Sequence, residues 1–225
     1  MSIVTSPLQE TIIIRQSYLR AKRIVDIIFT LLILFPLLLI TLIIAVLIKL
    51  DSAGPVFFRQ KRVGQNGVEF TILKFRSMYV NNDNSRHHEA IVKYMNGQKL
   101  VENSSDRILY KLVNDPRITR VGRFLRKYSF DELPQFFNVL SGNMTLVGPR
   151  PPLQFEVDCY SSHDKLRLCG KPGLTGPWQV YGRSLVPFQE MVEMDIAYLQ
   201  RSSLREDLKL IVLTVPVMIK GSGGV

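Results

Sequence analysis

Two adjacent acids, Asp131 and Glu132, stand in the segment 129–151, whose sequence is SFDELPQFFNVLSGNMTLVGPRP. Arg126 lies shortly before the acids, and Arg150 follows them within a Gly-Pro-Arg-Pro turn. Two carboxylates can hold a divalent metal ion, and a carboxylate can attack a phosphorus atom. Because arginine can bind two phosphate oxygens at once, this combination of residues points to chemistry on a phosphate ester.

A purely structural role is an alternative for the acidic pair. Ser129 and Glu132 match the spacing of a helix capping box, and acids in a first turn complement the helix dipole. Pro134 fits only near the start of a helix, and it places that start near Asp131 rather than at Ser129. Neighbouring helix residues point about 100° apart, so one acid can attack while the other helps to hold a metal ion.

The composition limits the classes of partner. The chain has 29 lysines and arginines against 19 acids, and its formal net charge is +10 over 225 residues. This balance suits nucleic acid, anionic lipid or a polyphosphate substrate. The sequence has no nucleic-acid-binding motif, so we expect no nucleic-acid partner. Cys159 and Cys169 lack the spacing of metal ligands, and Mg²⁺ is the expected ion because the candidate ligands are carboxylate and phosphate oxygens.

A membrane segment is expected near the N-terminus. Residues 27–48 carry no charge, and about 22 residues at a rise of about 1.5 Å can cross the hydrocarbon of a bilayer. Pro36 lies near the middle of this run and kinks or breaks a helix there. Basic residues flank the run on both sides: Arg15, Arg20, Lys22 and Arg23 before it, and Lys49, Arg59, Lys61 and Arg62 after it. Positive charge marks the cytoplasmic side, so a re-entrant helix explains both flanks, while a kinked spanning helix stays open.

The rest of the chain predicts further elements. Residues 55–78 read as a β-hairpin that turns at Gln65-Asn66-Gly67 and carries Lys74 on its second strand. A polar insert follows at about 79–114, with one short helix expected near 86–95. Further helices are expected at about 115–142 (two helices), 161–168, 187–201 and 204–219. The last is amphipathic, and it either packs on the core or lies at a membrane surface.

Several segments occur in a characteristic order. They are KRIVD (22–26), GPVFFRQKRVG (54–64), FTILKFRSM (70–78), DPRITRVGRFLRKYSFDELPQFFNVLSGNMTLVGPRP (115–151), PGLTGPWQVYGRS (172–184) and LREDLKLIVLT (204–214). This ordered set resembles the bacterial sugar transferase family, the monotopic polyprenyl-phosphate phosphoglycosyl transferases. The resemblance covers nearly the whole chain, except about the first 15 residues and the polar insert.

The resemblance implies a reaction and a location. It implies transfer of a sugar-1-phosphate from a UDP-sugar to polyprenyl phosphate, usually undecaprenyl phosphate, with Mg²⁺ and with release of UMP. Such a reaction begins the assembly of O-antigen, capsule or exopolysaccharide. The family also implies a re-entrant membrane helix and an active site on the cytoplasmic side of the bacterial inner membrane, at the inner leaflet.

The resemblance also assigns residues. By match to the Asp-Glu motif, Asp131 is the nucleophile that forms a covalent phosphosugar intermediate, Glu132 is its partner, and both are candidate metal ligands. The match further marks these substrate-binding or structurally critical positions: Arg126, Arg150, Arg183, Asp207 and Lys74. The chain departs from the family at Phe35-Pro36, where relatives often have Ser-Pro, and at the Thr-Gly-Pro-Trp of residues 175–178.

We therefore expect one α/β domain over 1–225, mostly helical with a small hairpin. It comprises a cytoplasmic segment at 1–23, a re-entrant membrane helix at 24–50, and a membrane-associated catalytic portion at 51–225. A homodimer is possible, and the sugar is open. The alternative function is a membrane-anchored basic scaffold that recruits anionic partners. A scaffold does not require an acidic pair set among Arg126, Arg150 and Arg183.

Overall fold

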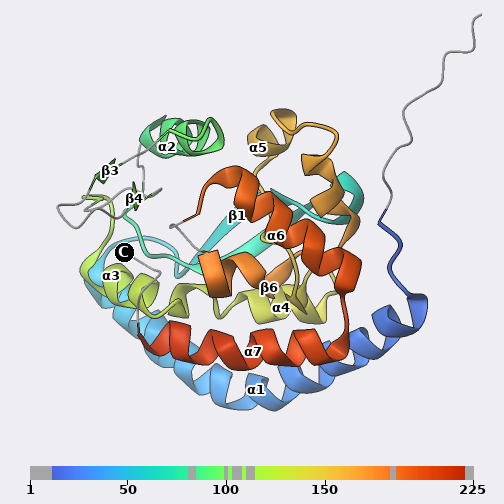
Figure 1. Cartoon of the computed structure of the whole chain (residues 1–225). Helices are drawn as coiled ribbons and strands as arrows, with labels where there is room; N and C mark the ends of the chain where they lie inside the picture. Colours follow the sequence, from blue (N-terminus) through green and yellow to red (C-terminus); the bar gives the residue numbers. More distant parts are fainter. Residues whose placement is uncertain are drawn as a thin grey trace, which may run out of the picture.

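The computed structural model describes residues 12–80, 85–98, 101–102, 108–109, 115–182 and 186–220. These parts of the chain are mostly helical (Figure 1). The helices are α1 (Gln16–Asp51), α2 (Ser85–Met95), α3 (Arg120–Lys127), α4 (Gln135–Leu140), α5 (Gln154–Asp158), α6 (Phe188–Arg201) and α7 (Leu204–Ile219). The strands are β1 (Phe57–Val63), β2 (Glu69–Phe75), β3 (Val101–Glu102), β4 (Ile108–Leu109), β5 (Thr145–Val147) and β6 (Gly173–Thr175). Short helical turns are η1 (Gln65–Gly67), η2 (Phe130–Glu132), η3 (Asp164–Cys169) and η4 (Trp178–Gly182).

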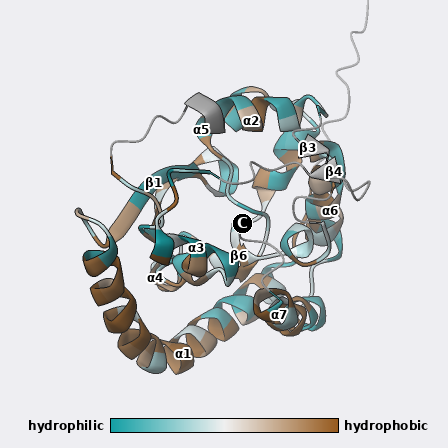
Figure 2. Cartoon of the chain, turned by 90° about the vertical axis from the view of Figure 1, so that its left-hand side faces the viewer, coloured by the Kyte–Doolittle hydropathy of each residue, from teal (hydrophilic) through white to brown (hydrophobic). Residues whose placement is uncertain are grey.

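Helix α1 exposes a large apolar surface. Within the described residues it is the one helix long and apolar enough to cross a membrane. Leu32, Phe35 and Leu39 in its middle are 73, 85 and 65 % exposed. Pro36 lies inside α1, and the helix curves around one side of the molecule with its most hydrophobic stretch on the outside (Figure 2). An exposed apolar surface of this kind fits a membrane location.

Both ends of α1 are attached to the same folded body. At the N-terminal end, Lys22 Nζ lies 2.7 Å from a carboxylate oxygen of Asp207 at the start of α7. At the C-terminal end, Asp51 accepts a hydrogen bond of 3.0 Å from the backbone N–H of Val121 in α3. The Arg76 guanidinium donates to the carbonyls of Ser52 and Ala53, at 2.7 and 2.6 Å. These bonds satisfy carbonyls at the end of α1 that have no partner within the helix.

The N-terminal half of α1 also fixes the centre of the fold. Asp26 accepts hydrogen bonds from the Thr145 hydroxyl at 2.6 Å and from the Leu146 N–H at 3.1 Å, both in β5. Arg23 donates to the carbonyls of Val139 and Leu140 at the end of α4. The Asp26 carboxylate is buried, and these donors provide the hydrogen bonds that a buried charge requires.

The hairpin that the sequence predicts is confirmed. Strands β1 and β2 pair in antiparallel fashion, with Phe57 opposite Phe75 and Val63 opposite Glu69. Asn66 and Gly67 take positive φ angles of 56° and 80°, which suit the tight turn that Asn-Gly favours.

A side chain of α4 closes the second edge of the hairpin. The Asn138 amide donates to the Thr71 carbonyl at 2.7 Å, and its oxygen accepts from the Leu73 N–H at 3.0 Å. Asn138 thus takes the place of a third strand along β2 and holds α4 at a fixed distance from it.

The sequence did not predict the parallel pairing of β5 with β6. At the end of this pair, Gly148 and Gly173 approach so closely that a Cβ on either residue would overlap the backbone of the other segment. The Gly-Pro-Arg-Pro turn therefore lies directly on the Pro-Gly-Leu-Thr-Gly segment, and glycine is required at both positions.

One core cluster joins most of these elements. Its buried members are Leu37, Ile72, Phe136, Val139, Met144, Leu146, Val147, Tyr198, Leu199 and Leu210. Helices α6 and α7 agree with the predictions for 187–201 and 204–219, and α2 agrees with the short helix predicted in the insert. The helix predicted at 161–168 is instead the 3-10 turn η3. α2 is docked on α6, because the Tyr94 ring meets Phe188 edge-on and its hydroxyl donates to the Val186 carbonyl.

Helix α7 is apolar on two sides. It runs beside α1 (Figure 1), and Leu210 is fully buried in the core. On its other side Leu208, Val212 and Val215 are 62, 59 and 53 % exposed. Core packing therefore accounts for only part of the apolar pattern, and the exposed part is what an interfacial helix would place in lipid.

Candidate active site

The acidic pair lies on the 3-10 turn η2, immediately before α4. Ser129, just ahead of the turn, has a left-handed backbone with φ of 59° and makes no capping hydrogen bond through its side chain. The α-helix begins at Gln135, after Pro134, and not near Asp131 as the sequence predicted. The capping box is therefore not formed, and capping does not account for Asp131 and Glu132.

Lys74 reaches the pair from the hairpin. Its Nζ lies 2.5 Å from a carboxylate oxygen of Glu132. The contact follows from the two Asn138 hydrogen bonds, which fix β2 beside α4 and so bring Lys74 next to η2. The structure thus places three residues that the sequence selected, Asp131, Glu132 and Lys74, in one site.

The two acids have different electrostatic environments. Asp131 is only 8 % exposed. Burial, together with the neighbouring Glu132 charge, raises the pKa of Asp131 to about 6, although Lys74 and Arg126 oppose the rise. Within the described residues, no group except the Asp131 backbone N–H hydrogen-bonds its carboxylate. A carboxylate without donors from other residues retains its basicity and nucleophilicity.

Glu132 shows the opposite shift. Burial by itself would raise the pKa of Glu132, but the Lys74 ion pair and the charges of Arg150 and Arg62 lower it. Glu132 is thus held as a carboxylate, while Asp131 is the more basic of the two. Adjacent acids with pKa values pushed apart are typical of sites where each acid has its own role.

Arginines surround the pair. Arg126 Nε is buried and has no hydrogen-bond partner in the described part of the chain. The Arg150 guanidinium lies 3.9 Å from Glu156 and stacks over the Trp178 ring at 5.7 Å. These two side chains can offer guanidinium N–H groups to phosphate oxygens.

Sequence reasoning missed a third arginine, Arg62, as a site residue. It is buried, lies 3.9 Å from Glu156, and donates to Gln60 and to the Pro151 carbonyl. Burial, and next the charge of Arg150, lower the pKa of Arg62. The hairpin register gave a usable signal. Arg62 lies four residues after Phe58, the partner of Lys74, and therefore on the same face of the hairpin as Lys74.

Comparison with known proteins shows the family of this chain. Residues 17–221 match the sequence profile of bacterial sugar transferases. The chain belongs to the bacterial sugar transferase family.

Relatives include proteins of different length. The chain is 43 % identical over 210 residues to "Galactosyl transferase CpsE" of Streptococcus agalactiae, covering 93 % of this chain and 44 % of that protein. It is 37 % identical over 215 residues to "Exopolysaccharide production protein ExoY" of Sinorhizobium fredii, covering 96 % of this chain and 92 % of that protein. It is 41 % identical over 202 residues to "UDP-glucose:undecaprenyl-phosphate glucose-1-phosphate transferase" of Klebsiella pneumoniae, covering 86 and 39 %. The chain thus spans less than half of two of these relatives and nearly all of ExoY.

Asp207, which the family resemblance suggested, lies away from the acidic pair. Asp207 bonds Lys22, the Tyr18 hydroxyl and the Tyr198 hydroxyl between α1, α6 and α7, and makes no contact with the acidic pair. Its link to the site is indirect, since the Tyr198 hydroxyl also bonds the Val147 carbonyl, one residue before the Gly-Pro-Arg-Pro turn. Arg183 lies outside the described residues.

The donor set of this sugar transferase fits Mg²⁺. The described residues contain no cluster of three or more histidines, cysteines or acids that could hold a metal ion. Asp131 and Glu132 supply two carboxylates. Mg²⁺ commonly uses one or two protein carboxylates and takes its remaining ligands from water and substrate phosphates.

The opposite environments of the two acids predict opposite effects on stability. In a metal chelator at pH 7.5, we expect Asp131→Asn to raise the melting temperature by about 2–4 °C, the effect of about 1 kcal/mol in a domain of this size. We expect Glu132→Gln to lower it, because the partner of Lys74 loses its charge.

The stability difference between Asp131→Asn and the wild type should depend on pH. An acid whose pKa is raised in the folded state from about 4 to about 6 stabilises the fold less as the pH rises through this window. The advantage of Asp131→Asn over the wild type should therefore grow between pH 4.5 and 7.5. Asp158→Asn, at an exposed acid, is the control and should change little. A lower melting temperature for Asp131→Asn would show that its carboxylate is stabilised by contacts absent from this structure.

Proposed function

We propose that this protein transfers a sugar-1-phosphate from a UDP-sugar to polyprenyl phosphate, with undecaprenyl phosphate as the acceptor, and releases UMP. The observation that carries the proposal is the buried Asp131 carboxylate, which has no donor from another described residue and lies beside Glu132, Lys74 and Arg126. The name of the Klebsiella relative describes this reaction for that protein. A basic scaffold would need no buried acid of this kind.

The reaction proceeds in two displacements. An oxygen of Asp131 attacks the phosphorus that bears the sugar, a P–O bond forms, and the bond to UMP breaks with the electron pair leaving on UMP. An oxygen of the polyprenyl phosphate then attacks the same phosphorus, and the Asp131 carboxylate leaves. No proton transfer is required, since the nucleophile and both leaving groups are anionic.

The positive side chains allow one anion to approach another. Arg126 and Arg150 bind the phosphate oxygens, with Arg183 as a further ligand, so the charge that builds up on phosphorus is stabilised. Lys74 holds Glu132 and contributes positive charge beside Asp131. Asp131 and Glu132 would hold Mg²⁺ through carboxylate oxygens, and the ion would supply positive charge that neutralises the diphosphate of the substrate.

A covalent mechanism suits substrates from two phases. The UDP-sugar comes from water and the polyprenyl phosphate from the membrane. With a covalent intermediate, the site can load from one phase, release UMP, and then admit the lipid, so the two substrates need not bind together.

We further propose that α1 is re-entrant, with the catalytic portion on the cytoplasmic side of the inner membrane. The support is the attachment of both ends of α1 to one body, through Lys22 at one end and Asp51 at the other. A straight helix of 36 residues would be about 54 Å long, and if it entered the bilayer its ends would emerge on opposite sides. The curvature of α1 (Figure 2) lets both ends return to one side.

The reaction is tested by release of UMP. Purified protein in detergent, with Mg²⁺ and undecaprenyl phosphate, should release UMP from at least one of UDP-glucose, UDP-galactose and the N-acetylated UDP-sugars. Asp131→Asn should lower the rate by about 10³-fold or more, because an amide is not a nucleophile here. Glu69→Gln, which removes an exposed carboxylate of a surface pair, is the matched control and should keep the activity. Folded protein that releases no UMP from any of these sugars contradicts the proposal.

The intermediate is tested by isotope exchange. Labelled UMP should exchange into the UDP-sugar without any polyprenyl phosphate, and Asp131→Asn should abolish the exchange. If protein that is active in the full reaction shows no exchange without the lipid, transfer is direct, and Asp131 has another role.

The topology is tested by labelling with a membrane-impermeant thiol reagent. Glu10→Cys and Leu50→Cys are introduced singly after Cys159 and Cys169 are replaced by serine. Both cysteines should react only after the inner membrane is opened. Reaction of Glu10→Cys from the periplasm would mean that α1 spans the membrane.

A further inference from the structure

The Gly-Pro-Arg-Pro turn is held by an unusually complete set of hydrogen bonds. The Pro149 carbonyl accepts from the Gly173 N–H at 2.9 Å, and the Pro152 carbonyl accepts from the Val63 N–H at 2.9 Å. Between them, the Pro151 carbonyl accepts from Arg62 Nη1 at 3.1 Å, and the Arg150 carbonyl accepts from Arg167 Nη2 at 3.2 Å. Four consecutive carbonyls thus accept from four donors, which come from three separate segments: β1, η3 and β6.

The prolines make these external donors necessary. Pro149, Pro151 and Pro152 have no N–H groups and fixed φ angles, so the turn cannot close on itself by ordinary backbone bonds. Its orientation is set by what donates to its carbonyls. Two of those donors are arginines, and both are buried.

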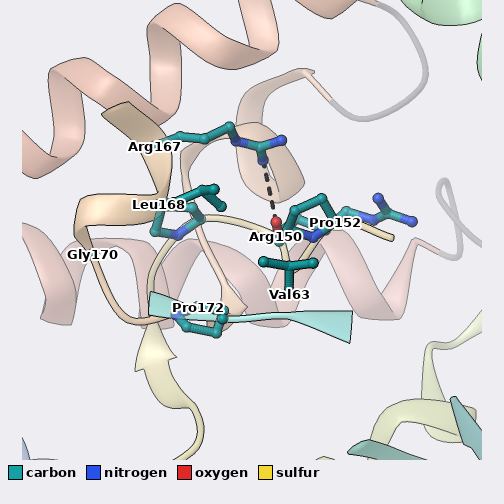
Figure 3. A pocket seen from close by; sticks show the side chains of 9 residues that line it. Val63, Arg150, Pro152, Arg167, Leu168, Gly170 and Pro172 are labelled. Atoms are coloured by element: carbon teal, nitrogen blue, oxygen red, sulfur yellow. Dashed lines mark hydrogen bonds between the residues drawn. The ribbon is translucent and has the colours of Figure 1, made fainter. Parts of the chain in front are cut away.

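Arg167 is the donor that cannot meet a substrate. Its side chain is 1 % exposed, and it lies against the fully buried Asp195, to which both Nε and Nη2 donate. Nη1 donates to the Tyr160 hydroxyl at 2.7 Å. Figure 3 shows the Arg167 side chain reaching from η3 to the carbonyl of Arg150.

The Arg167–Asp195 pair has little value as a source of stability. Removing two charges from water offsets most of their attraction, and apolar residues of similar size often stabilise a core equally well. A buried guanidinium does provide fixed donors in one plane, which a lysine or an apolar residue cannot provide. This property is used here to fix the backbone at Arg150.

We propose that Arg167, held by Asp195 and Tyr160, is a positioning residue that sets the direction of the Arg150 guanidinium by fixing the Arg150 carbonyl. Arg150 leaves the turn on the opposite side, between Glu156 and Trp178, and its charge acts on Glu132. The inference rests on the proposed function only in that Arg150 binds substrate phosphate.

Arg167→Lys tests the proposal. The lysine keeps the charge beside Asp195, but its single nitrogen cannot bond Asp195, Tyr160 and the Arg150 carbonyl together. We expect kcat/KM for the UDP-sugar to fall by about 10-fold or more. Arg150→Ala should lower kcat/KM by about 10²-fold in the wild type. It should lower kcat/KM much less in Arg167→Lys, because the misdirected Arg150 already contributes little to catalysis there.

A matched control separates positioning from general loosening. Arg76 is another buried arginine that donates to backbone carbonyls, but it does so at the end of α1 and not at the turn. In an Arg76→Lys background, Arg150→Ala should lower kcat/KM by the same factor as in the wild type. If Arg150→Ala lowers kcat/KM by that same factor in the Arg167→Lys background too, the proposal is overturned.

A second readout does not depend on activity. Modification of Arg150 by phenylglyoxal, followed by mass spectrometry of peptides, should be about 2- to 10-fold faster in Arg167→Lys, the factor that one hydrogen bond provides. An unchanged rate overturns the proposal. If the wild type releases no UMP, the proposed function fails, while this measurement still decides the role of Arg167.

A second variant tests the proposal in a protein that is expected to fold. If Arg167→Lys does not fold, Arg167→Met with Asp195→Leu removes both buried charges together and should keep the fold. It also removes the donor to Arg150, so the same loss of dependence on Arg150 and the same faster modification are expected. Wild-type activity and reactivity in this double variant would overturn the proposal.

Discussion

The hydrogen bonds from Asn138 to the open edge of β2 determine the geometry of the site. A two-stranded hairpin leaves N–H and carbonyl groups unpaired on its outer edge, and a buried edge must find partners. The Asn138 amide supplies a donor and an acceptor at 2.7 and 3.0 Å, as a neighbouring strand would. Because α4 is fixed against β2 in this way, the turn before α4 carries Asp131 and Glu132 to the side of Lys74. The ion pair between Lys74 and Glu132, and its lowering effect on the pKa of Glu132, follow from this arrangement.

The charges in the site serve two different ends. Glu132 is paired with Lys74, so its ionised form contributes to the fold. Asp131 is buried and has no ion-pair partner among the described residues, so its ionised form costs stability. Such a cost is expected where a group must be ready to react rather than be satisfied.

The sequence was informative where local signals agree with the fold. Asn66-Gly67 sets the hairpin, apolar periodicity sets α6 and α7, and the spacing of acids and arginines marked Asp131, Glu132 and Arg150. The parallel pair β5–β6 was missed because strands of three residues have no periodicity, and their partners are distant in sequence. The start of α4 was misplaced because the left-handed Ser129 and the 3-10 turn depend on tertiary contacts. Asp207 was selected through the family resemblance, and its partners on α1 and α6 could not be read from its own segment.

The position of the acids relative to α1 connects the site with the membrane. Phe130 and Leu133, the residues that flank the acidic pair, pack against a cluster that contains Ile44 and Ile48 of α1. The pair is therefore about one layer of side chains from the apolar helix, while Lys74 reaches it from the polar hairpin. If α1 lies in lipid, Asp131 lies at the boundary between the bilayer and water. The protein itself desolvates Asp131 and raises its pKa. In the proposed reaction, a site at this boundary would give a lipid-borne phosphate a short route to the same carboxylate that a nucleotide sugar reaches from water.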